Sequence, residues 1–358
     1  MRRGLMSWSR EELPASVLDK RVARLQARMK QEGLAAVLAY TSFAEPAAVH
    51  WLTNFTPYWS EAMLLVLPDQ APLLLASLTP RVHGWIREVS HLGEVVSAPR
   101  LAQGVLEMLA GKGVQPGARI GVIGLDSLPA GVALPLMEGW GAAAIVDAAL
   151  WFAALRQPCG KEELALACRA LEIGMQAVAG VPGDVRNTSE LAAAIEAGTR
   201  AAGAEEVLYR VAPDLSRGGA LERLEGELPL GPVYALELSV AYKGHWIRVG
   251  GSHARGAQQP AGWEAARAWF ADSLSRLAGH GADGLAAAPA RESRWALEAC
   301  IGVQPLTLAR TDEQEFVRLP SGSLAVFSAH AALDGGHWYQ SAPLVLGGGG
   351  QHGQVLRG

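Results

Sequence analysis

Residues 232–250 read PVYALELSVAYKGHWIRVG, and this stretch decides the fold. Between positions 234 and 241, large apolar side chains alternate with small or polar ones. A period of two is typical of a half-buried β-strand. Lys243-Gly244 predicts a tight turn, because glycine adopts positive φ without strain. Residues 245–249 predict the return strand, so the stretch is expected to form a β-hairpin.

The predicted hairpin carries a carboxylate on one strand and a guanidinium group on the other. Glu237 lies in the middle of the first strand, on the face with the smaller side chains, and Arg248 follows eleven residues later. An unpaired charge inside a sheet is costly, so Glu237 needs a partner. The residues alone allow a Glu237–Arg248 pair that bridges the hairpin near the protein surface.

The composition indicates an ordinary globular protein. With 358 residues, of which 50% are hydrophobic and 18% charged, the chain can form two domains with substantial cores. Its net charge of −4 gives no general attraction to nucleic acid or to an anionic membrane. No apolar run is long enough to span a bilayer, and Arg10-Glu11-Glu12 stand where a signal peptide would need its apolar core. We therefore expect a cytoplasmic protein that binds neither nucleic acid nor membrane.

The three cysteines predict neither a disulfide framework nor a zinc knuckle, because they are widely spaced and form no CxxC pair. Cys159 allows two interpretations. It precedes a predicted helix, whose N-terminus could lower the pKa of a reactive thiol. However, no His or Asp lies near it in sequence to complete a nucleophilic set. An ordinary free thiol is the favoured interpretation.

The first 150 residues alternate predicted strands with predicted helices. Two buried strands, LAAVLAY at 34–40 and RIGVIG at 119–124, frame a pair of strands that Pro68-Asp69-Gln70 joins. Strands alternating with helices indicate an α/β layer domain. Helices are expected at residues 15–33, 80–89, 101–111 and 128–137, and further strands at 61–67, 71–78, 95–98 and 144–147.

The second half surrounds the hairpin with helices and further strands. A polar loop at 213–227 contains glycines but no histidine. No histidine occurs between His280 and His330 either. Helices are expected at residues 161–181, 191–202, 260–277 and 291–300, and strands at 206–212, 324–329 and 339–346.

The hairpin resembles the central hairpin of the creatinase/Xaa-Pro dipeptidase/methionine aminopeptidase (M24) family, which has the pita-bread fold. In that family the hairpin reads roughly Asp-x-Gly, a Gly-Tyr turn, and a second Asp eleven residues after the first. Here Glu237 stands at the first Asp, Ser239 at the Gly, Gly244-His245 at the turn and Arg248 at the second Asp. The frame is kept, while the metal-ligand set is replaced.

The resemblance implies an α/β (α+β) protein of two domains. Residues 1–152 would form a creatinase-type N-terminal α/β domain, and residues 153–358 a pita-bread, aminopeptidase-like domain. In the family the N-terminal domain shapes the substrate pocket, often that of the neighbouring subunit, through the segment matching residues 56–61. This family relationship makes a homodimer, or a heterodimer with a family paralogue, the expected state.

Three side chains of the segment 56–61 are candidate contacts for a small-molecule or peptide ligand. Tyr58 and Trp59 beside the carboxylate of Glu61 could form a box for a cationic or amide group. The favoured alternative is that Trp59, like Trp51 and Phe55, belongs to a core or an interface.

The family's metal ligands are largely missing from this sequence. The segment GGHWYQ at 335–340 resembles the family's Gly-Gly-x-Arg-x-Glu and has an amide in place of the last carboxylate. Trp338 and Gln340, together with Arg248 of the hairpin, are therefore candidate substrate contacts. No acid stands at 328–330 for the other one. Two divalent cations need several anionic oxygens and an imidazole. We therefore predict no metal and no other cofactor, with the Arg248 guanidinium in the vacated volume and paired with Glu237.

Two functions fit these residues, and a third is less favoured. The first is a non-catalytic binding or scaffold subunit, which could partner an active paralogue. The alternative is a metal-independent hydrolase of creatinase type that cleaves C–N bonds of a small amide or amidine. That enzyme would need a general acid/base, for which Glu237, His245 and His330 are the catalytic candidates and Glu61 a further one. The less favoured function is an Xaa-Pro metallopeptidase.

Overall fold

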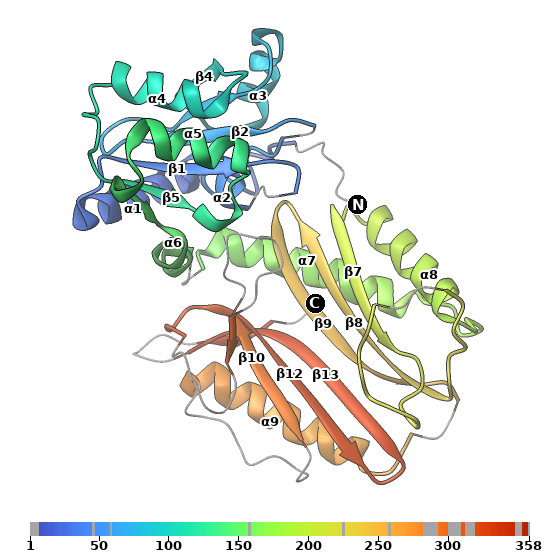
Figure 1. Ribbon diagram of the computed structural model, residues 1–358. Coiled ribbons are helices and arrows are strands. Elements are labelled where there is room, and N and C mark those ends of the chain that lie inside the picture. Colours follow the sequence, from blue (N-terminus) through green and yellow to red (C-terminus); the bar gives the residue numbers. More distant parts are fainter. Residues whose placement is uncertain are drawn as a thin grey trace. The chain divides into compact units, whose positions relative to one another are not determined.

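The computed structural model describes residues 7–44, 47–57, 59–156, 159–223, 226–256, 259–281, 293–299, 309–311, 319–347 and 353–356. The chain forms two compact units, one made mainly of residues up to Arg156 and the other mainly of residues from Gln157 onward (Figure 1). None of the described helices combines the length and the apolar composition needed to cross a membrane.

The first unit is a mixed sheet with helices on both faces (Figure 1). Its strand order is β4-β3-β2-β1-β5-β6, in which β1–β2 and β2–β3 are antiparallel and the other pairs parallel. The helices are α1 (Ala15–Glu32), α2 (Ala47–Thr53), α3 (His83–Val89), α4 (Leu101–Gly111), α5 (Ala130–Trp140) and α6 (Ala149–Arg156), and the strands are β1 (Ala36–Thr41), β2 (Ala62–Val66), β3 (Leu73–Ala76), β4 (Glu94–Ser97), β5 (Ile120–Ile123) and β6 (Ile145–Asp147).

The central strand β1 supplies side chains to two cores. Val37 and Ala39 pack with the apolar sides of α1, α2 and α3. Ala36 and Leu38 pack with those of α4 and α5. Successive side chains of a strand point to opposite faces, so a continuous apolar run such as LAAVLAY suits a strand that is covered on both sides. The expected α/β layer domain is present.

The helix α6 runs through the predicted domain boundary. Phe152 lies at the middle of this helix and is fully buried in the core of the first unit. The predicted division between residues 152 and 153 therefore falls inside α6, and the two units separate after Arg156.

The second unit is built on a larger sheet of strand order β11-β10-β12-β13-β9-β8-β7, with β14 paired to β13. All its strand pairs are antiparallel. The helices α7 and α8 lie along β7–β9, and α9 lies along β12 and β13 (Figure 1). The helices are α7 (Lys161–Ala179), α8 (Thr188–Ala201) and α9 (Trp263–His280), and the strands are β7 (Glu206–Ala212), β8 (Val233–Tyr242), β9 (His245–Ala254), β10 (Arg294–Ala299), β11 (Ala309–Thr311), β12 (Leu324–Leu333), β13 (Gly336–Val345) and β14 (Gln354–Val355).

The predicted hairpin is present as β8 and β9. Tyr242 pairs with His245, and the two turn residues Lys243 and Gly244 have φ values of 47° and 76°. Two consecutive positive φ values are typical of the turns that match the twist of a two-residue hairpin.

One segment folds differently from the prediction. Residues 291–300 were expected to be helical, but Arg294–Ala299 form β10, which pairs with both β11 and β12. Alanine, leucine and glutamate favour helices in isolation. Here the sheet overrides that preference, because Leu297 is buried in the core while Glu298, on the other face, meets a charged partner.

The hairpin continues into β13 through a close approach of backbones. Gly250 of β9 lies between Glu237 of β8 and Ser341 of β13 in the sheet register. A Cβ atom at Gly250 would lie 2.7 Å from the Leu236 carbonyl oxygen and 2.9 Å from the Glu237 Cα. The neighbouring Gly251 has open space, with nothing within 4 Å of a Cβ.

We expect Gly250→Ala to lower the free energy of unfolding by about 1–3 kcal/mol, because the added methyl group overpacks the sheet. The control Gly251→Ala should change it by less than about 0.5 kcal/mol. Urea unfolding followed by circular dichroism measures both. Equal effects of the two substitutions would contradict the proposed close approach.

Candidate functional site

Glu237 is the buried carboxylate at the centre of the second unit. The residue is only 3% exposed. Leu236 and Leu238 on either side of it pack with residues of α7 and α8. Since strand side chains alternate, Glu237 points to the sheet face opposite these two helices. We refer to this face as the inner face.

Both oxygens of Glu237 have partners. Arg210 of β7 donates from Nε and Nη2 to Oε1, at 2.7 and 2.6 Å. The Tyr339 hydroxyl of β13 donates to Oε2. Arg248 places its Nε 3.5 Å from Oε1 as a further charge contact. The predicted Glu237–Arg248 pair is therefore present, but Arg210 makes the closer contact.

Arg248 also reaches a second carboxylate. Its Nη1 donates to Oε2 of Glu298 at 2.7 Å, and its Nε lies 3.3 Å from the Ser239 hydroxyl. The strands β13 and β12 lie between β9 and β10 in the sheet. In a flat sheet, three strand spacings would separate the two backbones by about 14 Å. The long side chains of Arg248 and Glu298 cover this separation along the inner face.

The charges in this cluster balance. Two guanidinium groups, those of Arg210 and Arg248, face the two carboxylates of Glu237 and Glu298. The side chains of Arg248 and Glu298 are 14% and 10% exposed, whereas that of Arg210 is 40% exposed. We refer to these four residues with Tyr339 as the charge cluster.

Burial and the charge of Glu237 shift the pKa values of Tyr339 and Arg210. Burial, then the Glu237 charge, raises the pKa of Tyr339 well above its ordinary value. Tyr339 is therefore a neutral hydrogen-bond donor at physiological pH. Burial by itself would lower the pKa of Arg210, but the attraction of Glu237 offsets this, so the pKa of Arg210 is raised.

His330 is the predicted catalytic histidine that lies nearest the cluster. It sits on β12 directly across from Tyr339 in the sheet register, so both point to the inner face. Burial lowers the pKa of His330, and the neighbouring His337 and Arg294 lower it further. The imidazole is therefore neutral at physiological pH.

Three other predicted side chains lie away from Glu237. His245 is at the start of β9, five residues from the Gly250 that pairs with Glu237, which is about 17 Å along a strand. Trp338 is 1% exposed, and its ring packs against Phe270 of α9 at 6.0 Å. Gln340 follows Trp338 by two positions, so it also points to the α9 side rather than to the inner face.

The candidates from the segment 56–61 belong to the first unit. Trp51 and Phe55 are buried in the core, as the favoured alternative expected. Trp59 is 65% exposed and does not belong to that core. Glu61 accepts a hydrogen bond from the Tyr40 hydroxyl at 2.8 Å. Tyr58 lies outside the described residues.

Cys159 is a half-buried free thiol. The backbone N–H of Gly160 donates to the Glu163 carboxylate at 2.8 Å, which caps the start of α7. Burial, then the charge of Glu163, raises the pKa of Cys159 to about 11. The helix start therefore does not produce a reactive thiolate, in agreement with the favoured interpretation.

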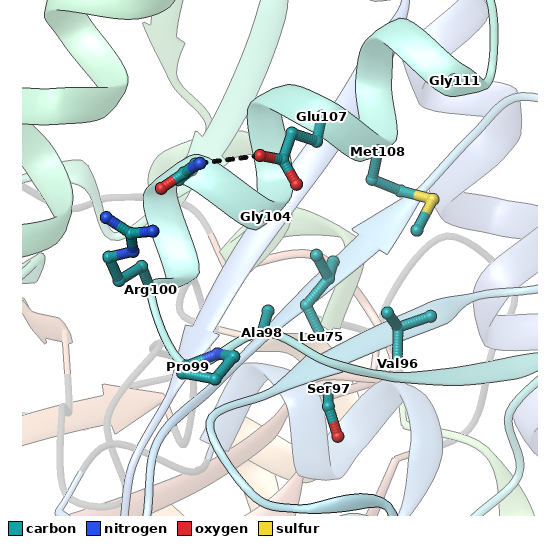
Figure 2. Close-up of a pocket in the computed structure, with 11 residues that line it drawn as sticks. Leu75, Val96, Ser97, Ala98, Pro99, Arg100, Gly104, Glu107, Met108 and Gly111 are labelled. Atoms are coloured by element: carbon teal, nitrogen blue, oxygen red, sulfur yellow. Dashed lines mark hydrogen bonds between the residues drawn. The ribbon is translucent and has the colours of Figure 1, made fainter.

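A separate hollow lies in the first unit beside the edge strand β4 and the helix α4 (Figure 2). Its volume of about 560 Å³ falls within the range of small-ligand sites. Gln103 donates to the Glu107 carboxylate at 2.8 Å, and Arg100 lies at one end of the hollow (Figure 2). The hollow is open and holds no buried charge, so it is a weaker candidate than the charge cluster.

The charge cluster does not fit a pair of divalent cations. Each carboxylate oxygen of Glu237, and Oε2 of Glu298, already accepts from an arginine or a tyrosine. Two fixed positive groups at this range repel a further cation. Within the residues that the structure describes, no three His, Cys, Asp or Glu side chains are grouped so as to hold a metal ion.

Three members of the cluster were missed from the sequence. Arg210 is separated from Glu237 by a long loop, so their register could not be read. Glu298 lay in the segment expected to be helical, although the alternation of Trp295 and Leu297 with Ala296 and Glu298 was a signal for a strand. Tyr339 carried no signal of its own.

Comparisons with known proteins agree with this fold. Residues 21–157 match the family model of the creatinase/prolidase N-terminal domain. Among solved structures, the X-Pro aminopeptidase of Thermotoga maritima MSB8 matches with a TM-score of 0.72 and 13% identity over 94% of this chain and 97% of that chain. The prolidase of Pyrococcus horikoshii OT3 matches with a TM-score of 0.72 and 14% identity over 94% and 97%.

A third match is not described as a peptidase. The N-terminal domain of the FACT complex subunit SPT16 from Cicer arietinum has a TM-score of 0.67 and 11% identity, over 96% of each chain. At such identities the likeness concerns the fold. A search of curated proteins found no match. The predicted creatinase-like N-terminal domain and pita-bread fold are thus confirmed.

We expect Arg248→Met to lower the free energy of unfolding by about 3–5 kcal/mol, because it leaves Glu298 buried without its closest positive partner. The double variant Arg248→Met/Glu298→Gln should lose less than the sum of the single variants. Arg186→Met, which removes the exposed pair with Glu190, is the control and should change stability little. Urea unfolding measures all four, and strictly additive losses would show that Arg248 and Glu298 do not interact.

We expect Cys159 to react slowly with iodoacetamide. In the background Cys168→Ser/Cys300→Ser it is the single thiol, and a pKa of about 11 gives roughly 300-fold less thiolate at pH 7.5 than an ordinary cysteine. The alkylation rate should still be rising at pH 10. A rate that levels off near pH 7 would show that the helix start activates this thiol.

Proposed function

Because residues 21–157 form a creatinase/prolidase N-terminal domain and the chain has the prolidase fold, we propose that this protein is a non-catalytic relative of the M24 peptidases. It would act as a binding or scaffold subunit rather than as a hydrolase.

The main support for the proposal is that the Glu237 carboxylate is already held by side chains of the protein itself. Its two oxygens accept from Arg210 and Tyr339, and the residue is 3% exposed. A general base must have a free lone pair within reach of substrate. A metal ligand needs the same lone pairs. Glu237 is enclosed by Arg210, Arg248 and Tyr339, so a substrate or a metal ion would have to displace one of these partners to reach its oxygens.

A scaffold role is compatible with this fold. One solved structure that shares it is described as a subunit of the FACT complex rather than as a peptidase. For the present chain, a homodimer or a heterodimer with an active paralogue remains part of the proposal, as does a cytoplasmic location.

A metal-independent hydrolase of creatinase type is the second candidate. It is favoured by the position of His330, a neutral imidazole across the sheet from Tyr339. Such an enzyme would use His330 to move a proton and the inner face to hold a small amide or amidine. Against it, Glu237 and Tyr339 already share a hydrogen bond, which leaves no open carboxylate beside that imidazole.

The test combines metal analysis with a substrate panel. We expect the purified full-length protein to contain no stoichiometric zinc, manganese, cobalt or iron. We also expect no turnover of Xaa-Pro dipeptides, creatine or small amides and amidines, with or without added Mn²⁺ or Co²⁺. An active prolidase assayed alongside is the positive control.

Two results would overturn the proposal. Stoichiometric metal together with dipeptide cleavage would identify a metallopeptidase. Metal-independent turnover that Glu237→Gln and His330→Ala both reduce at least about 100-fold, the usual range for loss of general acid/base catalysis, would identify the second candidate.

A further inference from the structure

The sheet of the first unit ends on one side at the strand β4. This strand pairs with β3, and among the described residues no strand lies on its other side. The outer backbone N–H and C=O groups of such an edge strand can pair with another chain. β4 consists of the four residues Glu94–Ser97. That length is enough for one added strand but too short to hold a stable dimer by itself.

Helix α4 lies beside this edge and has two distinct sides. Its buried side, with Leu101, Val105 and Leu109, packs into a core of the first unit. A neighbouring side lines the hollow with residues spaced three or four positions apart, which are Arg100, Gln103, Gly104, Glu107, Met108 and Gly111. Leu75 of β3 and Val96 of β4 line it from the sheet (Figure 2). The hollow is therefore a groove between a helix and the edge of a sheet.

The groove has an apolar lining and free space. Leu75 belongs to the adjoining core, and Val96 and Met108 pack against it as partly buried side chains. The flexible thioether of Met108 can adapt to side chains of different shape. A Cβ atom at Gly111 would meet nothing within 4 Å, so the groove is open at that end of α4. An apolar side chain of a partner can thus be accommodated here.

The two ends of the groove differ in charge. Near Gly111, Lys112 lies 3.3 Å from the Glu94 carboxylate, so opposite charges are paired there. Arg100, the N-cap residue of α4, is exposed at the other end (Figure 2). The positive end of the helix dipole lies at the same place. With Glu107 on the helix side between the two ends, the groove is complementary to an acidic group at Arg100 only.

We propose that the groove between β4 and α4 binds an extended peptide of a partner protein, which adds a strand to β4. An apolar side chain of the peptide lies against Val96 and Met108, and an acidic side chain lies at Arg100. In this mode of recognition, main-chain hydrogen bonds to the edge strand provide affinity and side-chain pockets provide specificity. An open groove suits a chain that enters at one end and leaves at the other. The site does not depend on whether the protein is catalytic.

The test begins with a display library of random linear peptides about ten residues long, roughly one strand with its flanks, selected on the full-length protein. Fluorescence anisotropy then measures the affinity of the enriched peptides. We expect apolar residues two positions apart, because alternate side chains of a strand face α4, and an acidic residue at one end. Methylation of the peptide's backbone nitrogens should weaken binding at alternate positions only, since a strand pairs with its neighbour through every second residue.

Two pairs of variants locate the binding. Gly111→Leu should weaken it at least about tenfold, because the new side chain fills the open part of the groove. The matched control Gly131→Leu changes an exposed glycine of α5, where a Cβ atom also meets nothing within 4 Å, and should have no effect. Arg100→Gln should weaken acidic peptides about threefold, as expected of one exposed ion pair. Its control is Arg81→Gln, at another exposed arginine.

The outcomes decide the proposal. It is supported if the peptides lose affinity for Gly111→Leu but not for Gly131→Leu. It is wrong if no peptide binds with a Kd below about 1 mM, if Gly111→Leu binds as tightly as its control, or if backbone methylation acts equally at every position. Should Gly111→Leu fail to fold, the comparison of Arg100→Gln with Arg81→Gln decides. A wild-type dimer in sedimentation velocity that Gly111→Leu dissociates would identify a second copy of the chain as the occupant and overturn the peptide proposal.

Discussion

The bridge that Arg248 makes between Glu237 and Glu298 constrains the whole second unit. It joins β9 to β10 across the two strands that lie between them, β13 and β12. Gly250, two positions after Arg248 on β9, pairs with Ser341 of β13 in the sheet register. Helices α7, α8 and α9 cover the opposite face with apolar side chains, and the charges thereby come to lie on the inner side.

The chemistry of the inner face follows from this bridge. Carboxylates that converge on one face of a sheet need positive charge between them, and guanidinium groups supply it here. Arg210 and Tyr339 complete the hydrogen bonds of Glu237, so the carboxylate is satisfied without any ligand. Farther along the same face, the rings of His330 and His337 stack, and Arg294 pairs with His330 in the sheet register.

The prediction of the site succeeded where local spacing was sufficient. Glu237 and Arg248 are on adjacent strands joined by a two-residue turn, so their common face could be read from the alternation of side chains. Gln340 was matched only by its place in a motif, and the structure puts it on the face of β13 that carries Trp338, opposite to Tyr339 and Glu237. Glu298 was missed because its segment has residues that favour a helix, whereas pairing with β12 makes it a strand.

The sequence by itself determined the hairpin, the α/β layers of the first unit and the placement of a carboxylate and a guanidinium group on one face of adjacent strands. These features depend on neighbours within about ten residues, whose periodicity and turn chemistry are visible in one dimension. Only the tertiary structure decided which acid Arg248 bridges, that Arg210 and Tyr339 saturate Glu237, and that two histidines stack beside Arg294. Those contacts depend on the twist of the sheet and on the register of strands that are distant in sequence, and both are set by packing across the whole unit.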